Sequence, residues 1–276
     1  MRNKTVRRYL RNHLAVVGAI LFAVIALAAP LAPYLSPYDY AAQDLDQRLK
    51  APSAVHVLGT DGYGRDVLSR VIWGARVSLE IGMVAAGLSI LLGIAIGAIA
   101  GFFGGAVDTW ITRFIDIFMS IPALFLVLII VALFGANVRN TMVVIGLVYW
   151  PGTARIVRAE FLRLRQFDFT EAARAMGATV WRIIVKQLLP NALPPIIVQA
   201  TLFVGEAILI ESGLSYLGLG AQPPLPSWGN MLVEGRRFLA SAWWIATFPG
   251  LAIFLSVLSL NLLGDGLRDA IDPRLR

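Results

Sequence analysis

Long stretches without any charged residue dominate the hydrophobic pattern of this chain. Four of them contain no Asp, Glu, Lys or Arg and cover residues 12–38, 81–107, 117–138 and 238–264. A charged side chain at the centre of a bilayer costs about 2.5 to 3.5 kcal/mol on insertion scales, and about 20 apolar helical residues cross the hydrocarbon core. Each stretch therefore predicts a membrane-spanning helix.

Two further segments are predicted to span the membrane although charged residues accompany them. Residues 140–154 are too short to cross alone, so this helix is expected to continue through Arg155. Residues 193–213 carry Glu206 and Glu211 within an otherwise apolar run. The whole pattern predicts an all-α integral membrane protein with six transmembrane helices.

The distribution of positive residues predicts how these spans are oriented. Cytoplasmic loops of membrane proteins carry an excess of Lys and Arg. With the N-terminus inside, 15 of the 24 Lys and Arg residues fall on the cytoplasmic side, which favours both termini in the cytoplasm. The expected organisation is a cytoplasmic N-terminal segment (1–13), a first transmembrane helix (14–35), an extracytoplasmic segment (36–74), a core of five transmembrane helices (75–265) that includes a cytoplasmic loop (155–190), and a cytoplasmic C-terminal tail (266–276).

The first span could instead be a cleaved signal peptide. Arginines precede its apolar run, and Ala26-Leu27-Ala28 resembles a small-residue cleavage site. However, the apolar run continues to Tyr38, which is longer than a typical signal core, and cleavage would leave an odd number of spans. We therefore expect a permanent helix.

The composition agrees with a lipid environment. Hydrophobic residues make up 58% of the 276 residues and charged residues 15%, and the mean hydropathy is +0.72. Soluble chains are near 45 to 50% apolar and about 25% charged. The net charge of +7 is explained by membrane topology, so we expect no nucleic acid partner.

Motifs for catalysis or cofactor binding are absent from the sequence. It contains no Gly-rich phosphate loop, no zinc-binding His-Glu-x-x-His and no Gly-x-Ser-x-Gly elbow. There is no Cys, and the two histidines, His13 and His56, lie far apart in the chain. We expect a non-catalytic chain without a metal or cofactor.

The two longest polar segments differ in character. Residues 36–74 are rich in turn-forming residues and could form either a small external lid or a packed connector. In residues 155–190, Asp168 and Glu171 have the spacing of a capping box that starts a helix. Gly177 fits the left-handed position that ends one. Small and apolar residues share one stripe of that predicted helix: Ala172, Ala175 and Met176, with Thr179 or Val180 beyond them.

Glycines recur every four residues in the second span and its exit, at Gly93, Gly97, Gly101 and Gly105. In lipid this spacing indicates close helix packing, because small residues let two backbones approach.

Glu206 and Glu211 are the notable ionisable groups within a predicted span. Such residues either line a transport path or satisfy structural needs. Glu206 could attract a cationic group such as a peptide amino terminus, or it could be structural. Glu211 is expected near the outer interface, where capping a helix end or pairing with Arg236 or Arg237 is favoured.

One group of residues in the cytoplasmic loop and the span that follows it resembles a known motif. Glu171-Ala172-Ala173, followed by Gly177 and then Leu189-Pro190, is similar to the EAA motif of permeases in binding-protein-dependent ABC importers. Gln187 stands where that family usually has an apolar residue. The resemblance implies a cytoplasmic coupling helix, starting near Asp168, that docks onto an ATPase subunit.

Further blocks extend the resemblance over nearly the whole chain. They resemble the C-type permeases of dipeptide, oligopeptide and nickel importers and cover residues 58–61, 64–70, 213–220, 226–231 and 261–269. The resemblance implies the type I ABC importer permease fold in a bacterial inner membrane. It also implies a second (B-type) permease, two ATP-binding-cassette ATPase subunits and an extracytoplasmic solute-binding protein as partners.

The substrate is left open by these observations. Di- and oligopeptides are expected, with nickel or other small solutes as the alternative within the same family. An ion-driven secondary transporter would show repeated halves, and a membrane enzyme would need a catalytic constellation. The sequence shows neither.

Overall fold

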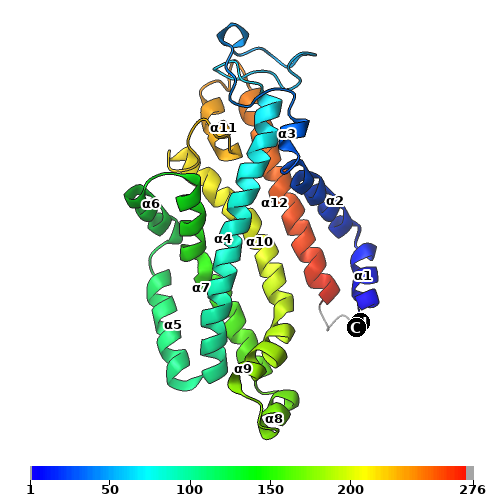
Figure 1. Ribbon diagram of the computed structural model, residues 1–276, viewed down its shortest axis with the longest axis vertical. Helices are drawn as coiled ribbons and strands as arrows, with labels where there is room; N and C mark the ends of the chain where they lie inside the picture. The colour runs from blue at the N-terminus through cyan, green and yellow to red at the C-terminus, as the bar shows by residue number, and fades with distance from the viewer. Residues whose placement is uncertain (1, 272–276) are drawn as a thin grey trace.

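The protein is a bundle of long helices with short elements at both ends. The structure is a computed structural model that describes residues 2–271, and helices are the regular elements of that range (Figure 1). In chain order they are α1 (Arg2–Arg11), α2 (His13–Ala28), α3 (Ala32–Leu35), the 3-10 helix η1 (Leu45–Gln47), α4 (Val67–Phe103), α5 (Gly105–Met119), α6 (Ala123–Phe134), α7 (Val138–Leu164), α8 (Asp168–Ala175), α9 (Val180–Ile183), the π-helix η2 (Ile184–Leu188), α10 (Leu189–Tyr216), α11 (Trp228–Arg236) and α12 (Trp244–Ile271).

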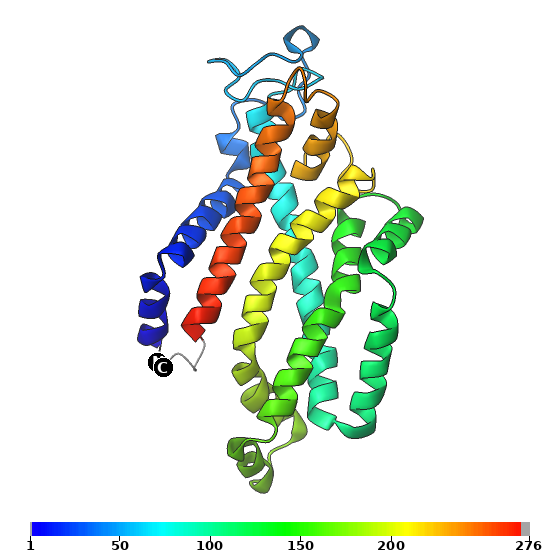
Figure 2. The same ribbon diagram turned by 180° about the vertical axis from the view of Figure 1, so that it is seen from behind.

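The long helices α4, α7, α10 and α12 form the body of the molecule. Figures 1 and 2 show α2 flanking α12 on one side, while α5 and α6 flank α7 on the other. The loop of residues 36–66 and α11 lie at one end of the bundle, and α8 and α9 lie at the opposite end. Helix α1 and the last turns of α12 lie side by side, on the half of the molecule that carries α8.

Several helices have the length and hydropathy needed to cross a membrane. Within residues 2–271, three continuous helical segments qualify: Val67–Phe103, Val180–Tyr216 and Trp244–Ile271. The pair α5 and α6 adds a fourth if it is counted as one broken span. Helix α2 is apolar but only 16 residues long, and the second half of α7 carries arginines. The arrangement of six spans therefore stays a prediction.

The apolar run 117–138, expected to be one span, is two helices. Helix α5 ends at Met119 and α6 begins at Ala123, and the two are bent by 75°. Pro122 occupies the N-cap of α6 and has no N–H to continue the hydrogen-bond ladder of the preceding helix. The hydrophobic run of the sequence hides this break because proline carries no charge.

Most of α5 lies before the run that the sequence pattern marked. It carries charged residues, and two of its carboxylates pair with arginines of α7. Asp108 accepts from Arg158 Nη2 at 2.7 Å, and Asp116 accepts from Arg155 Nη2 at 2.6 Å. These pairs hold α5 against α7, and they let a charged helix lie beside a span.

The most extensive helix contact in the bundle is the seam between α4 and α7. A Cβ atom added to Gly93 would lie 2.5 Å from Thr153 Cβ, and one added to Gly101 would lie 2.6 Å from Phe161 Cβ. At Gly97 it would overlap the backbone carbonyl of Ala154. The predicted close packing is thus confirmed at three of the four glycines. Gly105 differs, because it opens α5 with a φ of +53° and faces empty space.

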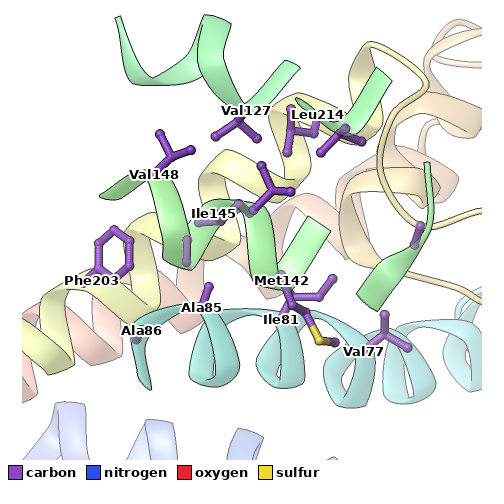
Figure 3. Packing of buried hydrophobic residues seen from close by; sticks show 14 residues of the cluster. Val77, Ile81, Ala85, Ala86, Val127, Met142, Ile145, Val148, Phe203 and Leu214 are labelled. Carbon is purple, nitrogen blue, oxygen red and sulfur yellow. The ribbon is translucent and has the colours of Figure 1, made fainter. Parts of the chain in front are cut away.

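The largest apolar cluster lies where α4, α6, α7 and α10 meet. Figure 3 shows Ile81 and Ala85 of α4 beneath Ile145 of α7, with Phe203 of α10 beside them. Val127 and Val131 of α6 belong to the same cluster, and both are fully buried. The broken helix pair is therefore part of the core, since one of its two halves packs into it.

A buried network of four charges ties the loop of residues 36–66 to the bundle. Arg65 donates from Nε to Asp61 at 2.6 Å and from Nη2 to Glu234 of α11 at 2.7 Å. Arg70 of α4 pairs with the same two carboxylates, and its side chain is 1% exposed. Two arginines and two carboxylates balance each other, which is the condition for burying charges at tolerable cost.

Further contacts hold the same loop in place. Asp66 caps α4 by accepting from the Ser69 N–H at 2.8 Å, and it lies 2.9 Å from His56 Nδ1. Trp244 of α12 donates from Nε1 to the Thr60 carbonyl at 3.1 Å. Residues 59–61 and 64–66 of this segment are buried, while most of residues 36–58 are exposed. His56 thus contacts the residue that caps α4. Among the described residues no group of three potential metal ligands occurs.

We expect Gly97→Ala to destabilise the protein by about 1 to 3 kcal/mol, because the added methyl group overpacks the α4–α7 seam. Gly87→Ala is the matched control on the same helix, because no atom lies within 4 Å of its added Cβ. That control should be neutral or slightly stabilising, since Ala favours helix over Gly. The measurement is the thermal unfolding midpoint of each detergent-purified variant. Equal midpoints for the two variants would show that the seam does not depend on Gly97.

Candidate functional site

The short helix α8 projects from one end of the bundle and is held there from its inner side. Ala173 is 4% exposed and joins an apolar cluster with Phe161, Ile183 and Leu188. Thr170 is fully buried and donates to the Leu164 carbonyl at 2.9 Å. These contacts fix the orientation of α8 relative to α7.

The opposite face of α8 is open. Glu171, Ala172 and Ala175 are exposed, and Met176 is 80% exposed. Small residues next to a flexible thioether form a surface that another protein can approach closely. The three residues of the Glu-Ala-Ala group thus divide: Ala173 anchors the helix, while Glu171 and Ala172 face outward.

The start of α8 differs from the predicted capping box. The N-cap is Phe167, whose side chain cannot cap, and Asp168 is the first helical residue. The backbone carbonyl of Phe167 accepts from the N–H groups of Thr170 and Glu171 at 2.8 and 3.3 Å. Asp168 and Glu171 still favour the helix, because negative side chains in the first turn interact well with the helix dipole.

The end of α8 is as predicted. Gly177 has a φ of +74°, its N–H donates to the Arg174 carbonyl at 2.9 Å, and the Ala178 N–H donates to the Ala173 carbonyl at 3.0 Å. This pair of bonds is a Schellman motif, in which glycine avoids the strain of the left-handed region. A side chain at Gly177 would meet no atom of this chain within 4 Å. Gly177 therefore faces open space.

A continuous helical segment connects this end of the molecule with the bundle interior. It runs from Val180 to Tyr216 over 37 residues and joins α9, η2 and α10. Leu189 and Pro190 form the first turn of α10, directly after the π-helical turn of η2. Gln187, the departure from the family motif, accepts from Asn191 Nδ2 at 2.6 Å through its carbonyl. Its side chain is not needed for that contact.

Glu206 lies on α10 at the wall of a small cavity. The cavity has a volume of about 300 Å³ and is enclosed by the α5–α6 break, the Pro151 region of α7 and α10. The Glu206 side chain is exposed, and within residues 2–271 it makes no hydrogen bond or ion pair. Besides Glu206, the polar residues of the wall are Tyr149 and Gln199, and its rings are Phe118 and Phe203.

Sequence reasoning singled out Glu206 but missed the other residues of this cavity. Gln199 could have been found, because it precedes Glu206 by two helical turns and so lies on the same face. Tyr149 and Phe118 come from other helices, and only the packed structure brings them together. Gln199 also lines a larger groove of about 640 Å³ between α7, α10 and α12, so the two hollows adjoin along α10.

Glu211 lies buried between α10 and α11, with partners other than the arginines considered from the sequence. It is fully buried and accepts from Ser215 Oγ at 2.7 Å and from Ser227 Oγ at 2.9 Å. Ser227 is the N-cap of α11, so the carboxylate ties α10 to α11. The alternative pairing with an arginine is wrong, because Arg236 contacts the Tyr216 hydroxyl instead.

Two family descriptions match this chain. Residues 93–276 match the family described as binding-protein-dependent transport system inner membrane component, which is two thirds of the chain. Residues 3–52 match the N-terminal transmembrane domain of oligopeptide transport permease C. The two matches cover both the bundle and the helices that precede it.

Relatives with known names align over nearly the full length. The dipeptide transport system permease protein DppC of Alkalihalophilus pseudofirmus is 44% identical, covering 96% of this chain and 88% of the relative. The glutathione transport system permease protein GsiD of Pectobacterium atrosepticum is 41% identical, covering 98% and 90%. The probable D,D-dipeptide transport system permease protein DdpC of Escherichia coli is 40% identical, covering 95% and 88%.

Solved structures share the fold. A chain of the MetNI methionine ABC transporter in an inward-facing conformation superposes with a TM-score of 0.59 at 22% identity, covering 75% of this chain and 97% of that one. The projecting helix, the glycine-packed bundle and these matches lead to one conclusion. This chain belongs to the family of binding-protein-dependent transport system inner membrane components, as a multi-pass ABC importer permease of the oligopeptide permease C type.

Proposed function

We propose that this chain is one of two permease subunits in an ATP-driven importer of di- and oligopeptides. It forms half of the translocation path, and a B-type permease forms the other half. Two ATPase subunits hydrolyse ATP, and an extracytoplasmic binding protein delivers the solute. The permease itself catalyses no reaction.

The observation that carries this proposal is the geometry of α8. A helix with an exposed face of Ala172, Ala175 and Met176, anchored on its other face by Ala173, suits docking onto a partner protein. The residues proposed for coupling are Asp168, Glu171, Ala172, Ala173, Gly177, Leu189 and Pro190. Of these, Leu189 and Pro190 belong to the continuous helix that also carries Glu206. A displacement of the docked loop would therefore be transmitted to the wall of the cavity.

Three features support six spans with both termini in the cytoplasm. Helix α1 and the end of α12 lie on the same half of the molecule as α8 (Figure 2). Positive residues concentrate in the segments at that end, in agreement with the positive-inside rule. Helix α7, the bent pair α5–α6 and the shorter apolar helix α2 supply the remaining three crossings, and two carboxylates of α5 pair with arginines of α7.

The names of relatives support peptides as the substrate. A dipeptide permease, a D,D-dipeptide permease and a glutathione permease all align over nearly the whole chain. These solutes share a peptide or peptide-like backbone and a free amino group.

Reconstitution into liposomes together with the partner subunits tests this proposal. We expect uptake of a radiolabelled dipeptide that requires both ATP and the binding protein. Uptake of nickel without uptake of peptide would show that nickel, and not a peptide, is the substrate. Uptake driven by an ion gradient in liposomes that lack the ATPases would contradict the proposal altogether.

Gly177→Trp is expected to lower uptake by about tenfold or more, because a bulky side chain at a docking surface opposes a coupling free energy of about 1 to 3 kcal/mol. The control is Gly135→Trp. Gly135 also has a positive φ, of +96°, and no atom within 4 Å of an added Cβ, but it lies between α6 and α7 rather than beside α8.

The measurement is the number of peptides taken up per ATP hydrolysed, at matched membrane levels of the two variants. The backbone strain is similar in both, so a defect confined to Gly177→Trp is attributable to docking. Normal uptake per ATP in Gly177→Trp would reject α8 as the coupling helix.

A further inference from the structure

We infer that the cavity around Glu206 is a binding subsite for a primary ammonium group that carries an apolar substituent, as the amino terminus of a peptide does. The inference rests on the proposed function and adds the position of a binding site and the chemical group that it binds. Its support comes from the position of Glu206, from the cavity wall and from the adjoining groove.

We expect Glu206 not to face lipid in the assembled protein. It lies ten residues before the end of α10, or about 15 Å along the helix at 1.5 Å per residue. An ionised carboxylate at such a depth costs about 2.5 to 3.5 kcal/mol if it is exposed to hydrocarbon. Within residues 2–271 it has no ion-pair or hydrogen-bond partner. It therefore requires water or a cation supplied from outside this chain.

Several acidic groups of the span region have partners within residues 2–271, and the cavity distinguishes Glu206 from the one on α4 that does not. Asp108 and Asp116 pair with arginines of α7, and Glu211 accepts from two serines. Glu160, at the wall of the adjoining groove, accepts from Arg163 at 2.6 Å. Glu80 of α4 is also exposed and has no hydrogen bond or ion pair within residues 2–271, but of these two carboxylates it is Glu206 that lines the cavity.

The cavity wall suits an ammonium group with an apolar neighbour. Tyr149 and Phe203 have ring centroids 5.6 Å apart and face the same hollow as Glu206. Aromatic faces attract cations and also bury apolar side chains. The Gln199 amide offers both a donor and an acceptor. A carboxylate, a hydroxyl and an amide beside aromatic rings together bind an ammonium group more readily than an anion.

The place of the cavity suits a passing solute. It lies at the 75° bend between α5 and α6 and beside Pro151 of α7, where regular helix packing is interrupted. Through Gln199 it adjoins the groove that extends toward Asn191 at the start of α10. A weak subsite with an adjoining exit is what conduction needs, because a solute must bind and then leave.

Charge-selective cysteine labelling tests this inference without relying on transport. The native chain contains no cysteine, so Gly152→Cys supplies the single thiol of this subunit. Gly152 lines the cavity with Glu206, and an added Cβ meets no atom within 4 Å. The assembled complex in nanodiscs is treated with a trimethylammonium methanethiosulfonate or with a sulfonate methanethiosulfonate, and the two rates are compared.

We expect the cationic reagent to react faster than the anionic one. Adding Glu206→Gln should lower the rate ratio by about fivefold or more, because one charge nearby acts oppositely on reagents of opposite sign. Taking the ratio cancels any effect of Glu206 on the reactivity of the thiol itself. Leu209→Cys is the control, because Leu209 lies on α10 in an apolar groove against α12; it should react with neither reagent.

A dipeptide with a free amino group should slow labelling of Gly152→Cys, and its N-acetylated form should not. This protection should disappear in the Glu206→Gln background. An unchanged rate ratio, or equal protection by both peptides, would overturn the subsite. So would a thiol that neither reagent reaches.

A partner cation is the competing explanation for the unpaired carboxylate. If Glu206 pairs with a residue of the second permease, Glu206→Gln should reduce recovery of that permease in the purified complex, and this result would also overturn the subsite. Normal ATP-dependent uptake together with failed labelling would remove the subsite and leave the proposed function intact. Labelling as expected without ATP-dependent uptake would support the subsite and contradict the proposed function.

Discussion

The structure depends first on the close approach of α4 and α7. In lipid no hydrophobic force draws two apolar helices together, so packing contacts must hold them. Gly93, Gly97 and Gly101 supply these contacts by leaving no side chain between the helices. Helix α4 carries Arg70 and so holds the loop of residues 36–66 at one end, and α7 supports α8 at the other. The loop of residues 36–66 and the candidate coupling helix α8 are thus both positioned by one seam.

The second constraint is that charged side chains near the membrane need partners of opposite charge or hydrogen-bond donors. Asp108, Asp116 and Glu211 are each matched by partners from another helix or from the segment before α11. The four-charge network around Asp61 and Arg70 is likewise balanced. Against this background Glu206 is informative, because it has no partner within residues 2–271 and lines a cavity that a ligand or a partner's side chain can enter.

Much of this architecture could be predicted from the sequence, and the failures have physical causes. Charge-free runs located most of α4 and α12, and the spacing of glycines predicted that α4 packs closely against another helix without indicating which one. The break between α5 and α6 was missed, because hydropathy does not register a proline that ends a helix. The capping box at Asp168 was wrong, because Phe167 is the N-cap and helix α8 starts at Asp168, one residue earlier than its side-chain pattern indicated. The cavity around Glu206 joins residues from four helices, α5, α6, α7 and α10, and no local pattern could reveal it.

The central claim is that this chain acts only as one subunit of an assembly that hydrolyses ATP elsewhere. The most direct measurement is to tag its C-terminus, solubilise native membranes gently and identify the co-purifying proteins by mass spectrometry. The account predicts recovery of a second multi-span permease together with ATPases that contain phosphate-binding loops. Recovery of a monomer or homo-oligomer that transports solute without any ATPase would contradict it.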